Sequence, residues 1–188
     1  MSRCDPDSNC TFFRSLFIAE NNLTGTWVIT DNLIDHNFLG QDGSVTADYN
    51  AYVTNATRFL PAGAHDVLLA VTNVTYDSLA GRYFYLQTNS PLINHGSQNA
   101  TNAGLYHFCT TTNQVKETNS TVDIGFHYVA LNAQPNTAAD TESDGTPDYQ
   151  EDANGNGSVD SGETDWRSAG DWGLRVLITR PRNNSNVP

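Results

Sequence analysis

Carboxylates recur at a fixed stride near the carboxyl end of the sequence. Two consecutive frames of twelve residues, 140–151 and 152–163, carry oxygen-bearing side chains at positions 1, 3, 5, 9 and 12 and a glycine at position 6. In order, the oxygen-bearing residues are Asp140, Glu142, Asp144, Asp148 and Glu151, then Asp152, Asn154, Asn156, Asp160 and Glu163. The spacing matches the loop pattern D-x-[DN]-x-[DN]-G-x5-E, from which only Glu142 departs.

A chain with this pattern can curl around a divalent cation. Calcium takes six to eight oxygen ligands at about 2.3–2.6 Å, and side chains at positions 1, 3 and 5 point to one side of the loop. Glycine at position 6 permits a sharp turn, after which the carbonyls of Thr146 and Ser158 at position 7 can face the ion. Glu151 and Glu163 would each close a site with two oxygens. We therefore expect about two calcium ions, with position 9 binding directly or through water.

Other ions fit these frames less well. Magnesium has a smaller octahedral shell that tolerates a bidentate carboxylate poorly. Zinc usually takes Cys and His ligands, and neither residue occurs in the two frames. The alternative interpretation is an acidic, disordered linker, since residues 140–165 hold nine acidic residues and no basic one. A random acidic tract has no reason to place glycines and carboxylates in register twice, so the register favours ion binding.

The two frames resemble the thrombospondin type 3 and dockerin-like calcium repeats of extracellular proteins. The resemblance is carried by Asp-Gly-Thr-Pro-Asp at 144–148 and Asp-Ala-Asn-Gly-Asn-Gly at 152–157. EF-hand pairs separate their loops with helices, whereas Asp152 directly follows Glu151, so we do not expect a helix-opening sensor. Dockerins usually carry helices and are longer, which makes them the minor option. The resemblance implies a segment in which the bound ions serve as the core.

The rest of the chain must position these loops, and it consists of short β-rich runs separated by Asn, Gly, Asp and Ser. The expected strands are Phe12–Ile18, Thr26–Thr30, Asp66–Val74, Arg82–Leu86 and Val122–Val129. Sustained helical periodicity is missing, and the runs recur at intervals of roughly 20 residues, which is typical of stacked solenoid coils. A β-sandwich, the alternative, predicts tighter spacing. We expect an all-β solenoid.

Three runs resemble the late coils of secreted bacterial right-handed parallel β-helix proteins of the pectate-lyase-like class. They are Ile-Thr-Asp-Asn-Leu-Ile-Asp at 29–35, Asn-Ser-Pro-Leu-Ile-Asn-His-Gly at 89–96 and Val-Asp-Ile-Gly-Phe-His-Tyr at 122–128. In that family a Ser-Pro-x-Ile-Asp-x-Gly segment and a later Asp-Ile-Gly-aromatic segment often mark the last coils. Here Asn94 and His95 stand where the family usually has Asp and Ala. The resemblance implies a right-handed parallel β-helix.

These patterns divide the chain into five parts. Residues 1–11 are unassigned, residues 12–130 are the expected coils, residues 131–139 form a polar linker, residues 140–165 form the tandem calcium loops, and residues 166–188 follow them. The last part begins as a linker, and its run at 174–182 resembles the opening strand of a following immunoglobulin-like module. The chain shows no signal peptide and no apolar run long enough to span a bilayer. We expect a piece of a longer exported protein.

Charge narrows the set of partners. The 9 basic and 21 acidic residues give a net charge of -12, which repels nucleic acid and anionic lipid. The 3 cysteines are too few for a disulfide scaffold, and their odd number leaves at least one unpaired. Calcium is the expected partner, with glycans or other cell-surface components as further candidates. The expected location is extracellular or at the cell surface.

Two functions from different classes follow. We favour a non-catalytic extracellular module, in which calcium loops rigidify the connection of a β-helix to downstream domains. The alternative is a fragment of a polysaccharide lyase or glycoside hydrolase, activities that parallel β-helices often carry. A lyase needs a base and cations for uronates, for which Lys116, Arg58 and Arg82 make a poor set. A hydrolase needs two carboxylates, and the candidates are Asp31, Asp35, Asp42, Asp48, Asp66, Asp77 and Asp123.

Overall fold

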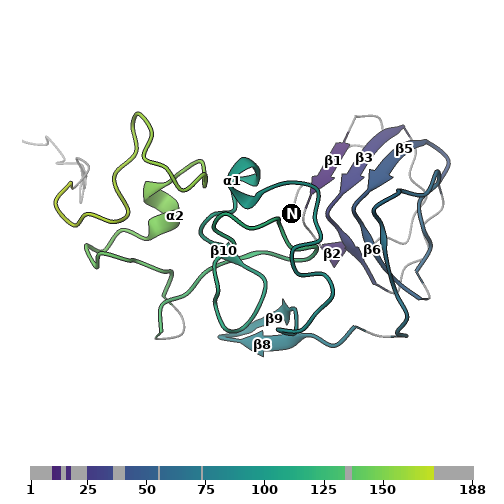
Figure 1. Cartoon of the computed structure of the whole chain (residues 1–188), viewed down its shortest axis with the longest axis horizontal. Helices are drawn as coiled ribbons and strands as arrows, with labels where there is room; N and C mark the ends of the chain where they lie inside the picture. The colour runs from purple at the N-terminus through teal and green to yellow at the C-terminus, as the bar shows by residue number, and fades with distance from the viewer. Residues whose placement is uncertain are drawn as a thin grey trace, which may run out of the picture.

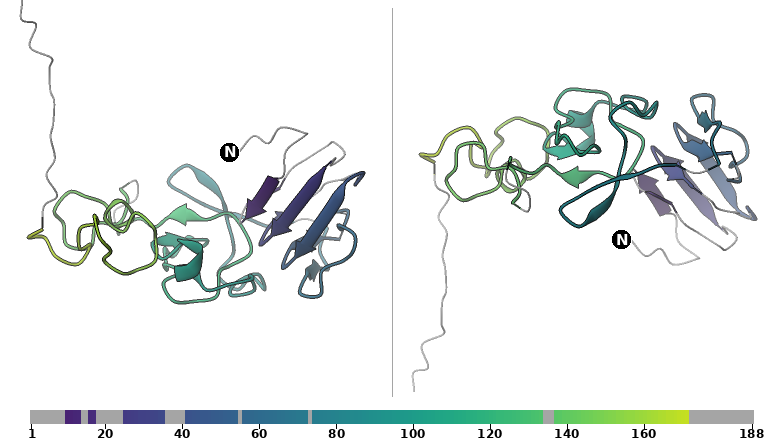
Figure 2. Two further views of the ribbon diagram at one scale, coloured as in Figure 1. Left: turned by 90° about the horizontal axis from the view of Figure 1, so that it is seen from above. Right: turned by 90° about the horizontal axis from the view of Figure 1, so that it is seen from below.

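Strands and irregular loops make up most of the molecule, as expected for an all-β chain. The computed structural model describes residues 10–13, 16–17, 25–35, 41–54, 56–72, 74–133 and 137–171. The elements are β1 (Cys10–Phe13), β2 (Leu16–Phe17), β3 (Thr26–Thr30), β4 (Leu33–Ile34), β5 (Ser44–Asp48), β6 (Ala51–Val53), β7 (Val67–Leu69), β8 (Asp77–Leu79), β9 (Arg82–Tyr85), α1 (Ala100–Ala103), β10 (Phe108–Cys109), β11 (Tyr128–Val129) and α2 (Asp148–Glu151). The shape is elongated, with parallel strands at one end and residues 140–171 at the other (Figures 1 and 2).

Two parallel sheets are built from strands that alternate between them along the chain. One sheet has the order β1-β3-β5 and the other the order β2-β4-β6-β7. In the first sheet Trp27 lies opposite Val45, and in the second Leu33 lies opposite Ala51. From β1 to β6 each strand of one sheet is thus followed by a strand of the other, so that the chain returns beside its earlier position, and β7 then joins the second sheet beside β6. The described residues contain no helix long and apolar enough to cross a bilayer.

The space between the two sheets is filled by alternate side chains. In β3 and in β5 the first four residues alternate between exposed and buried, because successive side chains of a strand point to opposite faces. The buried residues meet in one cluster with partners from the second sheet and from the loop between β6 and β7. Its members are Trp27, Ile29, Ile34, Val45, Ala47, Tyr52 and Phe59.

Two tight bends between the sheets have the same conformation. Asp31, between β3 and β4, has φ 63°, and Tyr49, between β5 and β6, has φ 56°. The residue after each bend, Asn32 or Asn50, is fully buried. Asn50 Oδ1 accepts a hydrogen bond from the Asn32 backbone N–H at 3.0 Å, 18 positions away. Asp66 Oδ1 accepts one from the Asn50 N–H at 3.0 Å, 16 positions away, so the three side chains stack along the bends.

The chemistry of Asp66 ends this stack. An asparagine can form hydrogen bonds with neighbours on both sides, since its side-chain amide has an accepting oxygen and a donating nitrogen. Asn50 Nδ2, for example, donates to the Ile29 carbonyl at 2.8 Å. A carboxylate only accepts, and the second oxygen of Asp66 accepts from Arg58 Nε and from the Gly63 N–H, each at 3.0 Å. Asp66 directly precedes β7, which is the edge strand of its sheet.

The middle of the chain joins the parallel strands to the carboxyl-terminal loops. Strands β8 and β9 pair antiparallel, as do β10 and β11. One apolar cluster combines the β4–β6 region with the middle of the chain, through Leu33, Ala51, Val53, Leu86, Leu92 and Ile124. Another contains Tyr85, Cys109, Ala130 and Ala139, of which Cys109 is a free thiol. Ala139 belongs to the expected linker, so the end of that segment packs against the body of the protein.

Three expectations about local structure need correction. The strand expected at Val122–Val129 exists only as β11, and the one expected at Asp66–Val74 only as β7. Val122 and Ile124 are buried as their apolar character predicts, but Asp123 between them bonds through its side chain to the Asn94 N–H at 2.7 Å. Burial alone therefore does not make a strand. The short helices α1 and α2 were also not expected.

The asparagine stack is testable by truncation. Asn50→Ala should lower the free energy of unfolding by at least about 2 kcal/mol, because each buried polar group left without its partner costs about 1–3 kcal/mol. The groups affected include the Asn32 N–H and the Ile29 carbonyl. Asn89→Ala, the same change at an exposed position, should stay within about 0.5 kcal/mol. Urea unfolding followed by circular dichroism measures both, and equal losses would contradict the role of the stack.

Candidate metal centre

The two twelve-residue frames fold into loops that share the same turns at positions 4 and 6. We call residues 140–151 the first loop and residues 152–163 the second loop. At position 4 the φ angles are 65° for Ser143 and 67° for Gly155, and at position 6 they are 96° for Gly145 and 79° for Gly157. All four lie in the left-handed region, where glycine is least strained. The register found in the sequence therefore corresponds to a repeated shape.

Repeated hydrogen bonds hold both loops in this shape. Asp140 Oδ2 accepts from the Gly145 N–H at 2.9 Å, and Asp152 Oδ2 accepts from the Gly157 N–H at 2.6 Å, so position 1 binds position 6 in each loop. The side-chain oxygen at position 5 also accepts from the N–H at position 7, at 2.6 Å in the first loop and 2.7 Å in the second. Oxygen-bearing side chains at these positions thus fold the loops as well as lining them.

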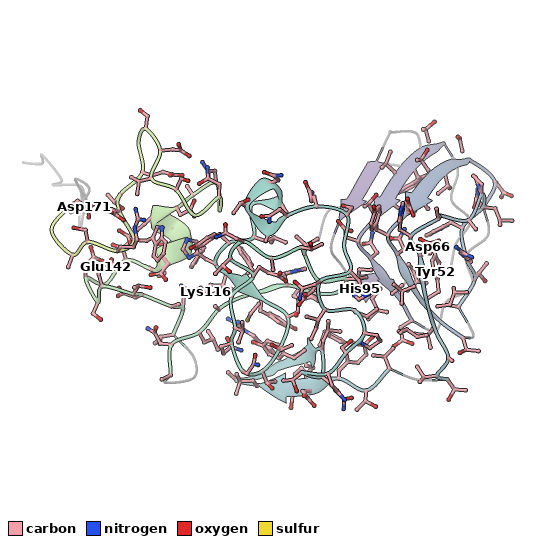
Figure 3. All side chains as sticks on the ribbon, viewed as in Figure 1. Tyr52, Asp66, His95, Lys116, Glu142 and Asp171 are labelled. Atoms are coloured by element: carbon pink, nitrogen blue, oxygen red, sulfur yellow. The ribbon has the colours of Figure 1, made fainter. Side chains whose placement is uncertain are left out.

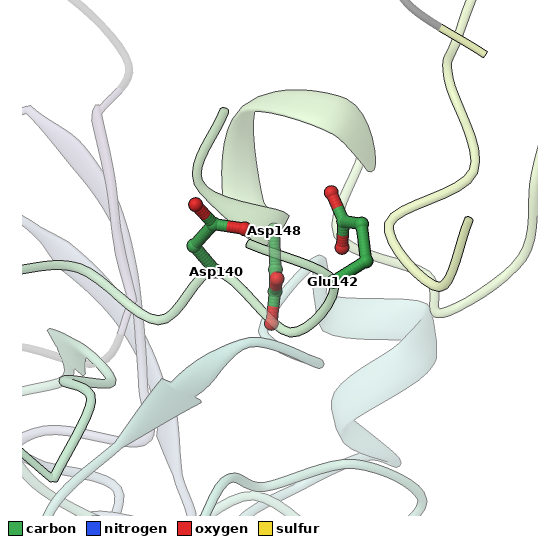
Figure 4. A group of neighbouring side chains, drawn as sticks. All are labelled: Asp140, Glu142 and Asp148. Carbon is green, nitrogen blue, oxygen red and sulfur yellow. The ribbon is translucent and has the colours of Figure 1, made fainter. Parts of the chain in front are cut away.

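Carboxylates of the first loop converge in two clusters that could hold a metal ion. One carboxylate oxygen from each of Asp140, Glu142 and Asp148 lies within 4.8 Å of the others. The same holds for Glu142, Asp144 and Glu151, so Glu142 belongs to both clusters. Figure 4 shows the first cluster beside the turn of helix that begins at Asp148. Five of the predicted ligands are therefore brought together.

Buried oxygens without donors distinguish the second of these clusters. Within the described part of the chain, no donor bonds to either carboxylate oxygen of Glu142 or to the Oε2 of Glu151, although all three atoms are buried. Glu151 is 2% exposed, and its other oxygen accepts from the Thr164 hydroxyl at 2.8 Å. A buried carboxylate oxygen with no donor is costly, and a coordinated cation removes that cost. Glu142, Asp144 and Glu151 thus form the better cation position.

The same crowding changes the protonation of Glu151. Burial, and after it the neighbouring Glu142 carboxylate, raises the pKa of Glu151 to about 7. Two carboxylates in contact cannot both be ionised cheaply unless a positive charge lies between them. The first loop therefore has two ways to relieve its repulsion, a retained proton or a bound cation.

Asp148 completes the first cluster, but residues around it already neutralise its charge. Lys116 Nζ donates to Asp148 Oδ2 at 2.5 Å, and the N–H and hydroxyl of Thr141 donate at 2.6 and 2.7 Å. Asp148 is fully buried. Position 9 of such loops often reaches the ion only through water, which leaves this side chain free for a structural role. Figure 3 shows Lys116 between the middle of the chain and the loop that carries Glu142.

One turn of helix carries ligand positions of both loops. Helix α2 contains Asp148 and Glu151, positions 9 and 12 of the first loop, and its C-cap is Asp152, position 1 of the second. The sequence showed no room for a helix between the loops, and the helix lies inside the first frame instead. Its acidic first turn was the available signal, because negative side chains stabilise a helix N-terminus.

The second loop satisfies its carboxylates with its own amides. Asn154 Nδ2 and Asn156 Nδ2 both donate to Asp160 Oδ2 at 2.8 Å. Glu163 accepts from the Asn154 N–H at 3.2 Å and the Asp160 N–H at 2.9 Å. Asparagines stand where the first loop has Glu142 and Asp144, so the second loop carries less negative charge. Charge count is one determinant of calcium affinity, and it ranks the second loop below the first.

Three residues outside the loops that sequence reasoning did not place at the site lie against them. His107 Nε2 is 2.9 Å from Asp152 Oδ2, Lys116 contacts Asp148, and the Trp166 ring centroid is 4.9 Å from that of His107. The first pair is 45 positions apart in the chain and the second 32. No local pattern marks such pairs, because they depend on the path of the chain between them.

A separate pair of buried carboxylates, Glu117 and Asp123, lines a cavity of about 330 Å³. Burial, and then the charge of Glu117, raises the pKa of Asp123. Burial acts on Glu117 in the same direction, but the hydrogen bond with His127 Nε2 at 3.0 Å, the charge of His127 and the hydrogen bonds from Ser120 and the Asp123 N–H together outweigh it and lower the pKa of Glu117. Opposite pKa shifts of this kind are typical of acid–base pairs.

The oxygens of this pair are nevertheless engaged inside the protein. Asp123 accepts from the Asn94 N–H at 2.7 Å and from the Thr110 hydroxyl. Glu117 accepts from His127 and, through Oε2, from the Ser120 hydroxyl at 2.7 Å. Each oxygen of both carboxylates has a donor, so the arrangement fits a buried structural network.

The chain was compared with protein-family models, curated proteins and solved structures, and none of them matches. Contacts within the molecule are therefore what indicates its function. Those contacts bring the five acidic side chains of the first loop together, and they close the second loop on itself with the same turns at positions 4 and 6.

Proton release tests the cation position. Below about pH 7 Glu151 should hold its proton in the ion-free protein, because burial and Glu142 raise its pKa to about 7. Calcium binds the carboxylate, so binding near pH 6 should release close to one proton from this site and near pH 8 almost none. Titration calorimetry in two buffers of different ionisation heat measures the release, and Glu151→Gln should abolish it. Equal release at both pH values would contradict the assignment.

The sign of the effect on folding follows from the same pKa. Because the folded value lies above the ordinary 4.5, the retained proton stabilises the ion-free fold fully below about pH 4.5. That stabilisation is lost as the pH rises through about 7. The calcium affinity of the first loop should change in the opposite direction and fall as the pH drops below about 7.

Proposed function

We propose that residues 140–163 bind calcium in two consecutive loops. The observation that carries this proposal is the set of buried, donorless oxygens of Glu142 and Glu151 at the point where the first loop's carboxylates converge. The second loop repeats the turns of the first at positions 4 and 6, its hydrogen bond between positions 6 and 1, and its hydrogen bond between positions 7 and 5. It is included on that ground, with Asp152, Asn154, Asn156, Ser158, Asp160 and Glu163 as its ligands.

Calcium is favoured over other ions by the donor set. The converging groups are carboxylates, and calcium takes six to eight hard oxygen ligands in a flexible geometry. Magnesium demands a near-ideal octahedron and keeps several waters, which five crowded carboxylates leave little room for. Zinc sites usually include His or Cys, and the histidine nearest the loops, His107, is turned to Asp152 by a hydrogen bond.

The role we infer is structural and extracellular. Calcium-binding modules outside cells commonly work at about 10⁻⁴ to 10⁻³ M, close to extracellular calcium and far above cytosolic levels. Bound ions would cancel the repulsion among the acidic side chains and hold the loops in one shape. The segment would then be a stiff connection between the parallel strands and whatever domain follows, in a protein exported to the cell surface or beyond.

For the amino-terminal half we propose coils of a right-handed parallel β-helix. Support comes from the two parallel sheets with alternating strands, from the repeated bends at Asp31 and Tyr49, and from the side-chain stack of Asn32, Asn50 and Asp66. Such a body would present a long surface to glycans or other cell-surface components, which we propose as partners.

No observation on the described residues favours the alternative function, a polysaccharide-degrading enzyme. Lys116 is paired with Asp148, Arg58 with Asp66, and Arg82 donates to the Val129 carbonyl at 2.8 Å. These three cations are therefore committed to internal contacts. Glu117 and Asp123 are likewise engaged by internal donors, so we retain the calcium module as the conclusion.

Calorimetric titration of the ion-free protein with calcium at neutral pH tests the proposal. We expect two binding events, the tighter one in the more acidic first loop. Glu151→Gln should weaken the tighter event at least about tenfold, since it removes a closing carboxylate. Glu163→Gln should abolish the weaker event and spare most of the first.

Asp42→Asn is the matched charge control, because Asp42 is exposed and lies far from both loops in sequence. It removes one negative charge and should leave both events in place. A wild-type protein that gives no calcium heat would end the proposal.

A further inference from the structure

The second loop is joined to the body of the protein through a buried histidine. His107 is 1% exposed, and its Nε2 lies 2.9 Å from Asp152 Oδ2. Asp152 is itself 1% exposed and occupies position 1 of the second loop. Because a carboxylate oxygen only accepts, the Nε2–H of His107 is the donor in this contact. Asp152 Oδ2 also accepts from the Gly157 N–H at 2.6 Å, so two donors hold this oxygen in place.

Aromatic and cationic side chains surround this contact. The Trp166 ring, which follows the second loop in the chain, lies 4.9 Å from the His107 ring and 5.6 Å from the Tyr106 ring, centroid to centroid. Lys116 Nζ lies 5.6 Å from the centre of the Trp166 ring while it bonds to Asp148 of the first loop. The body thus reaches a ligand position of each loop, with Trp166 packed over the junction.

Glycines allow the backbones to touch at the same place. The Tyr106 N–H donates to the Gly155 carbonyl at 3.0 Å. A Cβ added at Gly155 would lie 2.2 Å from the Gly104 carbonyl oxygen, and one added at Gly157 would lie 2.3 Å from the Tyr106 ring. In contrast, a Cβ at Gly145, the matching position 6 of the first loop, would meet nothing within 4 Å. Only the second loop is docked through its glycines.

We propose that His107 is a positioning residue of the second calcium loop, and that ion binding there and docking of the loop on residues 104–107 form one linked equilibrium. This inference rests on the proposed calcium function. Asp152 links the two processes, because its carboxylate is held by the body on one side and begins the ion-binding loop on the other. The body and the calcium segment then act as one unit that calcium tightens.

Linkage makes the effect reciprocal. If docking orients Asp152 and so strengthens ion binding by some factor, ion binding must strengthen docking by the same factor. Residues that orient metal ligands by hydrogen bonding typically change affinity about 10- to 100-fold when removed. His107 should therefore influence the second loop in this range and the first loop much less.

Calorimetric titration of the full chain with calcium tests the positioning role. His107→Ala should weaken the second binding event at least about tenfold and leave the first within about threefold. His107→Gln keeps an N–H donor near the Nε2 position and should restore most of the affinity. Equal weakening of both events by His107→Ala, or no recovery in His107→Gln, would mean that the histidine only supports the fold.

A pair of glycine variants tests docking independently of His107. Gly157→Ala and Gly145→Ala place a Cβ at the same loop position with φ 79° and 96°, so each strains its own backbone. Only the first also collides with Tyr106. Hydrogen exchange read by mass spectrometry should show that calcium slows exchange in residues 104–107 of the wild type and of Gly145→Ala, but not of Gly157→Ala.

The outcomes separate this inference from the proposed function. Two calcium events in the wild type, with no change of exchange in residues 104–107, would overturn the linkage and leave calcium binding intact. Absence of any calcium event would overturn both. Slowed exchange that survives in Gly157→Ala would also overturn the linkage, since the collision with Tyr106 should separate the second loop from the body.

Discussion

The carboxyl-terminal end of this protein depends on the neutralisation of crowded negative charge. Carboxylates that converge in a partly buried space repel one another, and the penalty grows as water is excluded. Glu142 and Glu151 are placed so that three of their four oxygens are buried without a donor. Burial and the neighbouring Glu142 carboxylate also raise the pKa of Glu151, because a retained proton removes one of the negative charges. A divalent cation bound between these carboxylates would remove the repulsion, in a loop already shaped by its own hydrogen bonds.

The two loops meet this constraint by different means. In the first loop Lys116 neutralises Asp148 from outside, and the remaining carboxylates are left for a cation. In the second loop the side-chain N–H groups of Asn154 and Asn156 donate to Asp160. Uncharged donors thus satisfy a carboxylate that a cation would otherwise neutralise. The carboxylates of the first loop therefore need a cation more than those of the second loop, which already have donors within the loop. With their different charge, the two proposed loops would bind calcium with different affinities.

The opposite end of the molecule is also organised by buried polar side chains. Strands there are two to five residues long, too short for backbone pairing alone to fix their register firmly. Asn32 and Asn50 bridge successive bends, and Asp66 ends the series because a carboxylate cannot donate onward. In both halves, side chains that accept hydrogen bonds from the backbone fix the path of the chain. In other proteins longer strands or helices do this. A cation bound at the carboxyl-terminal end would be the charged counterpart of the amide stack at the other.

The sequence alone determined features that are local. The glycine and carboxylate register of 140–163, the turns it implies and the strand Thr26–Thr30 depend on residues close in the chain, and the structure has these turns and this strand. Apolar character did not determine the state of Val122–Val129, because a buried run can be strand or loop. The neutralisation of Asp148 and the anchoring of Asp152 were decided by tertiary structure, since their partners lie 32 and 45 positions away. Which oxygens end buried and donorless was decided there too, because burial is a property of the whole fold.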